Sequence, residues 1–169
     1  RKDGLDIYCD VYPYDALNTN LKTLLPNWVL KNNKENMLDI LRNDALFDKI
    51  IPIITENADH DFSKIFITGL SQDSNRKILG LSLAEIAKMW SYQPEVAVIK
   101  LLLMEQGEVT IIQHGMCEAD IMQVLQWPYS MIGSDAGARM SVGTLAKGLP
   151  HPRTYGTFPR VINRYVKEL

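Results

Sequence analysis

The sequence predicts an α/β fold in which most strands run parallel. Strand patterns alternate along the chain with helical apolar patterns, as they do in folds of this class. The 169 residues are 46% hydrophobic and 22% charged, so the chain can form a core and does not have the composition of a disordered segment. The length suits one domain but falls short of the roughly 250 residues of a complete barrel of eight βα units.

The charge balance argues against a protein that binds polyanions. Eighteen Lys and Arg residues against 20 Asp and Glu residues give a net charge of −2, and they form no basic stripe. We therefore expect no nucleic-acid partner. No apolar run is long enough to cross a membrane, so we expect no membrane partner either. Cys9 and Cys117 lie far apart and outside a CxxC spacing, which favours free thiols in the cytoplasm.

The first third of the chain changes from a strand pattern to a helical one. Polar and apolar residues alternate over residues 5–12, which fits either a half-exposed edge strand or a barrel strand with polar groups pointing into a site. Residues 18–54 then show helical apolar spacing, and we expect Asn33 to cap the helix that begins at Lys34. A short strand follows at residues 64–68.

Two helices are predicted in the middle of the chain from their end signals. Ser82 and Glu85 form a capping box, in which each side chain bonds the backbone of the other residue. Pro94 suits a first helical position, and Gly107 suits the end of that second helix. We interpret the apolar cluster at residues 99–104 as core rather than as a cofactor site.

The last third is predicted to hold a strand at residues 108–113, a helix at residues 117–126 and a strand at residues 129–134. The last of these is nearly continuously apolar, as expected for a strand covered on both faces. A final helix is predicted with Thr157 as its N-cap and Pro159 in its first turn.

Asp135 is the first candidate for a catalytic group. It lies just past the carboxyl end of the strand at residues 129–134, the edge where parallel α/β folds place ligands and catalytic groups. Gly133 and Gly137 would let a ligand or backbone approach closely. A structural role, in which Asp135 only organises the following turn, is equally open from position alone.

Basic residues lie at the end of the loop at residues 136–152 and just after it. His151, Arg153 and Arg160 place an imidazole and two guanidinium groups close together in the sequence, a combination that could bind a carboxylate. Arg160 could instead be only surface charge. Phosphate-loop, zinc-protease and nucleophile-elbow signatures are absent, and the three histidines have no ligand-like spacing.

Four segments carry the motifs of one enzyme family in the family's order. They are D-V-Y-P-Y at residues 10–14, G-L-S-L-A-E-I-A at residues 80–87, M-I-G-S-D at residues 131–135 and H-P-R-T-Y-G-T-F-P-R at residues 151–160. These segments resemble the D-x-Y-P-Y, G-x-S-L-x-E-I-A, I-G-S-D and H-P-R-x-x-G-T-F-P-R segments of the N-acyl-D-amino-acid deacylases (D-aminoacylases), which are zinc amidohydrolases. The motifs span nearly the whole chain.

The resemblance implies a partial (β/α)₈ TIM-like barrel, comprising its C-terminal strands and helices, with a small α-rich insertion. The barrel segment would occupy residues 1–52, and the inserted small α/β segment residues 53–115. Residues 116–169 would hold the last barrel strand, the active-site loop and a helix. The full-length enzyme would hydrolyse the amide bond of N-acyl-D-amino acids to a carboxylate and a D-amino acid.

The resemblance also implies roles for individual residues. The carboxylate that matches Asp135 is the family's catalytic group, which takes a proton from metal-bound water and returns it to the leaving amine. We expect Arg153, His151 and Tyr155 to bind the substrate. The family binds zinc through Cys and His residues mostly upstream of this segment, and neither cysteine of this chain falls at the ligand position, so no metal ligand is assigned here.

Two further expectations concern the chain by itself. Part of a barrel leaves strand edges unpaired, so we expect the chain to associate with itself. Because the zinc ligands would lie upstream, we expect no catalysis by this chain alone.

Two alternative functions remain open. One is a non-catalytic α/β module that binds a partner or a small ligand. Another is a cyclic-amide hydrolase such as a dihydroorotase, which shares the catalytic Asp. An H-x-H motif and a further His-bearing strand upstream would favour the enzyme.

Overall fold

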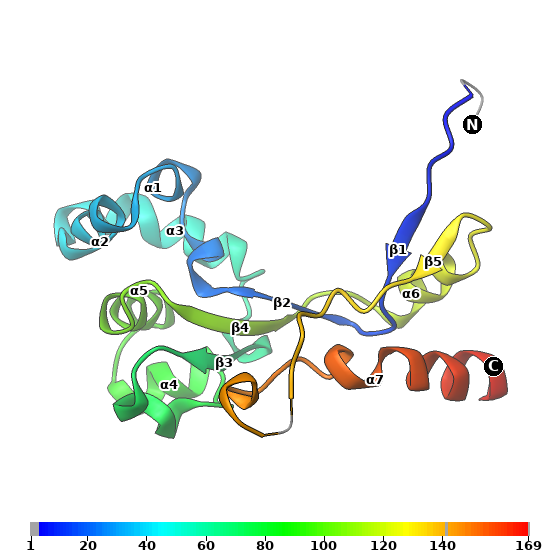
Figure 1. The fold of residues 1–169 in the computed structure, drawn as a ribbon. Helices are drawn as coiled ribbons and strands as arrows, with labels where there is room; N and C mark the ends of the chain where they lie inside the picture. Colours follow the sequence, from blue (N-terminus) through cyan, green and yellow to red (C-terminus); the bar gives the residue numbers. More distant parts are fainter. Residues whose placement is uncertain (1–3, 141, 169) are drawn as a thin grey trace. The chain divides into compact units, whose positions relative to one another are not determined.

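The computed structural model describes residues 4–140 and 142–168, and the chain divides into two compact units (Figure 1). Unit 1 joins the first segment, up to Leu17, to the segment that begins at Gly115. Unit 2 is the continuous stretch Asn18–His114. Within unit 2, the helices of residues 18–52 share one apolar core with the helices that follow residue 82.

Unit 1 is built on two parallel strands, β1 (Cys9–Val11) and β5 (Ser130–Ile132). The register pairs Cys9 with Ser130 and Val11 with Ile132. Helix α6 (Glu118–Leu125) packs against both strands, and a 3-10 turn (Thr144–Ala146) lies in the long loop that follows β5. Helix α7 (Arg153–Arg160) continues as a π-helical segment, Val161–Glu168. The parallel pair and its helices confirm the α/β prediction for this unit.

Three predictions in unit 1 need correction. The strand expected at residues 5–12 pairs only over β1, and the strand expected at residues 129–134 is not covered on both faces, because Met131 is 50% exposed. Among the described residues β5 pairs with β1 alone, and this small sheet has too few neighbouring elements to cover both faces of β5. Thr157 is not an N-cap: α7 begins one turn earlier, and the Thr157 hydroxyl donates to the carbonyl of Arg153 at 2.8 Å.

Unit 2 contains a three-stranded sheet in the order β2–β4–β3. Its strands are β2 (Ala16–Asn20, which begins in unit 1), β3 (Ile65–Leu70) and β4 (Val109–His114). β3 and β4 are antiparallel, so this pair departs from the prediction of mostly parallel strands. β2 overlaps, at residues 18–20, the stretch for which the sequence predicts helices. It is held by β4, to which the Asn18 side chain donates at the Ile111 carbonyl.

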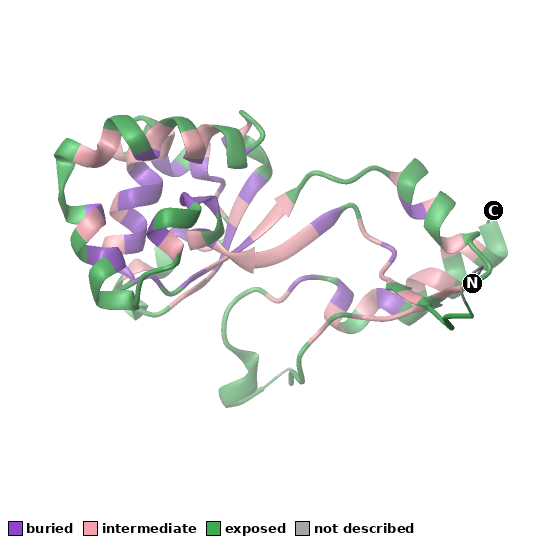
Figure 2. Cartoon of the chain, turned by 90° about the horizontal axis from the view of Figure 1, so that it is seen from above, coloured by how far each residue is buried: buried purple, intermediate pink, exposed green. Residues whose placement is uncertain are grey.

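Helices and short turns surround this sheet and enclose most of the buried side chains (Figure 2). The helices are α1 (Asn27–Leu30), α2 (Lys34–Arg42), α3 (Phe47–Asn57), α4 (Leu83–Trp90) and α5 (Pro94–Met104). The 3-10 turns are Leu21–Leu24, Asp44–Leu46, Phe62–Lys64 and Asp73–Ile78.

The predicted helix ends of unit 2 are confirmed. The Asn33 side chain accepts from the backbone N–H of Asn36, and Ser82 and Glu85 form the full capping box. Pro94 occupies the start of α5, and Gly107 has a φ of 78°, the left-handed conformation that favours glycine after a helix. Most of the apolar cluster at residues 99–104 is buried in the core, although Met104 is exposed.

One carboxylate, that of Glu105, is fully buried in unit 2. It accepts hydrogen bonds from the backbone N–H groups of Ser71 and Gln72 at 2.7 and 2.8 Å, and from the Asn75 amide. Burial by itself would raise the pKa of Glu105, but these hydrogen bonds outweigh it and hold the pKa below its ordinary value. Glu105 therefore fixes the loop between β3 and the next turn.

Candidate active site

Two segments that lie far apart in the sequence, residues 10–14 and 151–160, contact each other in unit 1. The Arg160 Nε donates to the Pro13 carbonyl at 2.6 Å, and the Tyr14 hydroxyl donates to the Pro152 carbonyl at 3.4 Å. A β-carbon on Gly156 would collide with the Tyr14 hydroxyl. The glycine of the H-P-R-x-x-G pattern is therefore required here by a close approach to an aromatic side chain.

His151 lies at the centre of this contact and is only 3% exposed. Its Nδ1 accepts from the backbone N–H of Arg153 at 3.0 Å, and its Nε2 lies 3.0 Å from the Ala16 carbonyl. The ring also meets the rings of Tyr12 and Tyr14 edge to face. Both ring nitrogens are thus engaged within the protein.

Arg153 is the first residue of α7, and its guanidinium group is largely buried. The Arg153 Cζ lies 4.6 Å from the centroid of the Tyr12 ring, in a cation–π contact. Its Nη2 lies 3.0 Å from Oδ2 of Asp135. The predicted site residues Arg153 and Asp135 are thus in direct contact.

Asp135 follows β5 by three positions, at the carboxyl end predicted from the sequence. Its side chain is 72% exposed, and its φ of 46° is in the left-handed region, which Asp tolerates better than most residues. Backbone conformations of this kind gather at functional sites. Gly133 lets the strands approach closely, since a β-carbon there would lie 3.1 Å from the Asp10 Cβ.

Tyr155, the fourth predicted site residue, is separate from this cluster. Its side chain is 57% exposed on α7. The ring, hydrogen-bond and ion-pair contacts that join Asp135, Arg153 and His151 do not include it.

Sequence reasoning missed the two tyrosines that complete the cluster. Tyr12 stacks on Arg153, and Tyr14 contacts His151 and Arg160. One signal could have found Tyr12, because the alternation at residues 5–12 places its side chain on the polar face of that strand. The signal for Tyr14 was weaker, since it follows the proline that ends the pattern.

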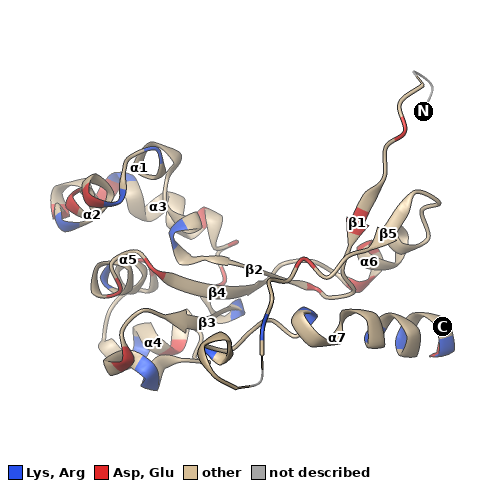
Figure 3. Cartoon of the chain, viewed as in Figure 1, with Lys and Arg blue, Asp and Glu red and all other residues tan. Residues whose placement is uncertain are grey.

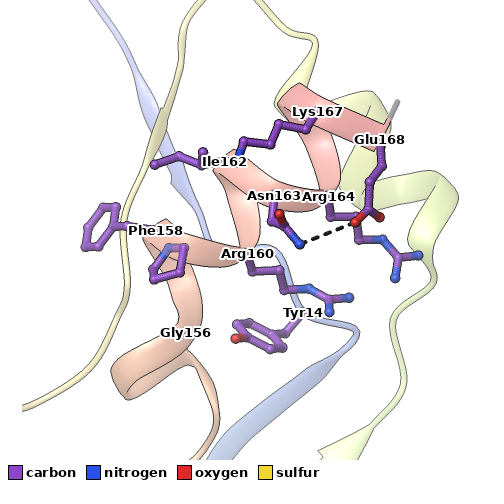
Figure 4. A pocket seen from close by; sticks show the side chains of 10 residues that line it. Tyr14, Gly156, Phe158, Arg160, Ile162, Asn163, Arg164, Lys167 and Glu168 are labelled. Carbon is purple, nitrogen blue, oxygen red and sulfur yellow. Dashed lines mark hydrogen bonds between the residues drawn. The ribbon is translucent and has the colours of Figure 1, made fainter.

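A cavity of about 850 Å³ lies beside Tyr14 and the end of α7 (Figure 4). The figure shows the Arg160 guanidinium beside the Tyr14 ring, and the measured separation from Cζ to the ring centroid is 4.9 Å. A hydrogen bond of 3.3 Å joins Asn163 to Glu168 on another wall. The lining of the cavity thus combines basic side chains, such as Arg160, with apolar ones, such as Phe158.

Basic positions lie along α7 and the helical segment after it, and acidic positions lie on α6 (Figure 3). One of these acidic residues is Glu118, at the start of α6. Its carboxylate accepts from the Tyr165 hydroxyl at 2.5 Å and from the Arg164 Nε at 3.1 Å. Burial, followed by the hydrogen bond and the charge of Glu118, raises the pKa of Tyr165 above its ordinary value. This network fixes the helix that carries Arg153 against α6.

A zinc ion does not fit the side chains of the described residues. Catalytic zinc takes about three protein ligands from His, Cys, Asp and Glu. No group of three such residues with that geometry occurs within residues 4–140 and 142–168. Asp135 offers one carboxylate, and its nearest charged partner is a guanidinium group. The same part of the chain contains no helix long and apolar enough to cross a membrane.

Two bacterial enzymes are similar to this chain, although no family model matches it. The N-acyl-D-glutamate deacylase of Alcaligenes xylosoxydans xylosoxydans is 27% identical over 168 residues, which cover 99% of this chain and 25% of that enzyme. The D-aminoacylase of the same organism is 41% identical over 58 residues, which cover 34% of this chain and 10% of the enzyme.

Solved structures agree with this similarity. The crystal structure of N-acyl-D-glutamate deacylase from Bordetella bronchiseptica, with zinc and a phosphonate that mimics the tetrahedral intermediate, matches with a TM-score of 0.64 and 26% identity over 99% of this chain. A D-aminoacylase structure shares the fold, with a TM-score of 0.60 and 24% identity over 99% of this chain. Each match covers 25% of the solved chain.

Sequence and fold together thus relate the chain to deacylases. It is a homologue of N-acyl-D-glutamate deacylase and D-aminoacylase, and it spans about a quarter of the length of the first of these relatives. The mixed α/β fold matches the corresponding part of those enzymes.

Proposed function

We propose that this chain supplies the part of a zinc-dependent N-acyl-D-amino-acid deacylase that carries the proton-transferring carboxylate. The observation that carries the proposal is the contact of 3.0 Å between Arg153 and Asp135 at the carboxyl end of β5. These residues come from two segments that resemble deacylase motifs, and the homology to deacylases supports the same reading.

Asp135 suits a general acid–base role because its carboxylate is exposed while its backbone is fixed next to a strand. It would accept a proton from the attacking water and deliver it to the leaving nitrogen of the amide. The described residues include no ligand set for zinc, so the ligands of a complete deacylase would lie in the part of that enzyme that this chain does not span.

Arg153 would bind the carboxylate of the N-acyl-D-amino acid. Its contact with Asp135 involves one terminal nitrogen, and the guanidinium fork carries five N–H donors. Burial strengthens such a charge-assisted bond, and Tyr12 holds the group in place. Tyr155 is exposed on the same helix and would contact the substrate beyond Arg153.

The architecture of a complete enzyme is part of the proposal. β1 and β5 would be adjacent strands of a (β/α)₈ barrel, since they are parallel neighbours joined by a long crossover. The segments proposed as barrel are residues 1–52 and 116–169, with an insertion at residues 53–115. Cys9 and Cys117 are free thiols, which suits a cytoplasmic enzyme.

A chimera tests the proposal. This chain would replace the matching quarter of the N-acyl-D-glutamate deacylase, and hydrolysis of N-acyl-D-amino acids and zinc content would be measured. We expect turnover in the chimera and a loss on the order of 10²–10⁴-fold on Asp135→Asn, the size typical of a general acid–base group. A zinc-loaded chimera whose turnover survives Asp135→Asn would refute the role of Asp135.

Binding to the 169-residue chain gives a second test that needs no catalysis. N-Acetyl-D-methionine is titrated while the side-chain resonances of Arg153 are followed by NMR, with the L-enantiomer as the matched control. Perturbation by the D-compound supports the site. A chain that binds neither enantiomer, together with an inactive but folded chimera, would favour a module without deacylase function.

A further inference from the structure

We infer that His151 is a positioning residue, which in its neutral Nε2–H form ties the backbone of Arg153 to the segment after β1. The consequence for catalysis rests on the proposed function, because it acts through the Arg153–Asp135 pair. The structural part of the inference concerns three groups: the His151 ring, the Arg153 N–H and the Ala16 carbonyl.

The hydrogen-bond pattern assigns the tautomer of His151. A backbone N–H can only donate, so Nδ1, which receives the Arg153 N–H at 3.0 Å, must be the unprotonated nitrogen. The other ring nitrogen faces a carbonyl oxygen, that of Ala16, which can only accept. Nε2 therefore carries the proton. A doubly protonated ring would direct an N–H at the Arg153 N–H.

The surroundings of the ring restrict its orientation. His151 is buried, and the rings of Tyr12 and Tyr14 lie 6.0 and 5.3 Å from its centroid at steep angles. A rotated imidazole would lose both hydrogen bonds and leave buried polar groups unpaired, which is unfavourable. The ring is thus fixed as a bridge.

His151 affects Asp135 indirectly, because Arg153 contacts both residues. The His151 ring fixes the first backbone N–H of α7, the Arg153 side chain stacks on Tyr12, and its Nη2 contacts the Asp135 carboxylate. Asp135 itself is largely exposed, so the position of its carboxylate depends on a guanidinium group held from behind. His151 thereby sets where the proposed acid–base group lies without touching the substrate.

Three substitutions separate the two hydrogen bonds of the ring. The Oδ1 of Asn in His151→Asn can replace Nδ1 as the acceptor for the Arg153 N–H. The Nε2 of Gln in His151→Gln can replace the donor to Ala16 but leaves Arg153 without an acceptor. His151→Phe removes both bonds and keeps the ring. The same substitutions at His60, which is exposed in unit 2, provide the matched control.

NMR on the 169-residue chain measures the outcome. Long-range ¹H–¹⁵N correlations report the tautomer of His151, and the Arg153 Nε–H resonance reports stacking on Tyr12 through its ring-current shift. We expect the Nε2–H tautomer, an Arg153 resonance retained in His151→Asn, and its loss in His151→Gln and His151→Phe. An Nδ1–H tautomer in the unsubstituted chain would overturn the inference, whatever the variants do. So would an unchanged Arg153 resonance in both His151→Gln and His151→Phe.

Activity in the chimera adds a readout that depends on the proposed function. We expect His151→Phe to lower kcat/KM by about 10²-fold, the size of effect that a misplacement of about 1 Å produces, and His151→Asn to restore most of it. An inactive chimera with the expected NMR result would refute the proposed function and leave the bridge established. An active chimera that tolerates His151→Phe would refute positioning.

Discussion

Arg153 Nη2 lies 3.0 Å from Asp135 Oδ2, and the two side chains differ widely in exposure, at 9% for Arg153 and 72% for Asp135. The buried member of the pair is also the one with additional partners, namely Tyr12 at its guanidinium face and His151 at its backbone N–H. The pair therefore has a fixed cation and an accessible anion. That arrangement suits a carboxylate which must reach a substrate while staying in one place.

The first prediction concerns the shape of the Arg153 side chain. Arg153→Lys keeps the charge but removes the planar fork and weakens the stacking on Tyr12, so we expect unit 1 to lose about 1–2 kcal/mol of stability. Urea unfolding followed by NMR resonances of each unit measures this. Arg42→Lys, at an exposed position of α2, is the control. Equal, negligible effects of both changes would show that the fork and the stacking do not matter.

The second prediction concerns the close approach of Gly156 and Tyr14. Gly156→Ala should destabilise unit 1 by about 1–3 kcal/mol, as overpacking does, because its new β-carbon meets the Tyr14 hydroxyl. Tyr14→Phe removes the colliding oxygen, and the ring carbon that bore it lies 3.5 Å from the built β-carbon, an ordinary contact. The double variant should therefore recover most of the loss.

Denaturant unfolding of the two single variants and the double variant gives the coupling between these sites. Gly137→Ala is the matched control, because a β-carbon there would meet no atom within 4 Å. Additive effects of Gly156→Ala and Tyr14→Phe would contradict the collision.

The third prediction is a pH dependence of stability that comes from Glu105. Its pKa is lowered in the folded state, so its stabilising contribution is complete above the ordinary value of 4.5 and is lost as pH falls through the folded-state pKa. Glu105→Gln should cost about 1–3 kcal/mol at neutral pH, because an amide N–H then faces backbone N–H donors. It should also flatten the stability profile of unit 2 below the ordinary pKa.

Urea unfolding of unit 2 at a series of acidic pH values measures that profile. Glu56→Gln, which removes an exposed carboxylate of α3, should leave it nearly unchanged. A profile that is equally steep with and without the Glu105 carboxylate would rule out this origin.

The fourth prediction is that the 169-residue chain associates with itself. Among the described residues, β1 and β5 form a sheet of two strands, so each has one unpaired edge, and Met131 in β5 is half exposed. Light scattering should show a mass that rises with concentration. Met131→Lys places a charge on β5 and should lower that mass. A concentration-independent monomer would contradict the prediction.

Local structure was largely predictable from the sequence. The helix caps at Asn33 and Ser82 need only residues three positions apart, and the position of Asp135 follows from a strand that ends just before it. The antiparallel pairing of β3 with β4 was not predictable in the same way, because its partners lie far apart and either direction buries the same apolar residues. β2 was missed for a related reason: its sequence has no strand pattern.

In the candidate site too, local features were predictable from the sequence and long-range contacts were not. The sequence alone determined which residue types are present, namely a carboxylate after a strand and an H-P-R segment a few residues before the predicted start of a helix. The tertiary structure decided that His151 bridges to Ala16, 135 positions away, and that Arg153 stacks on Tyr12 beside Asp135. A side chain's role depends on which atoms surround it once it is buried, and those atoms come from segments that no local pattern relates. Burial of the imidazole between two backbone groups is the observation from which we infer that His151 supports its neighbour.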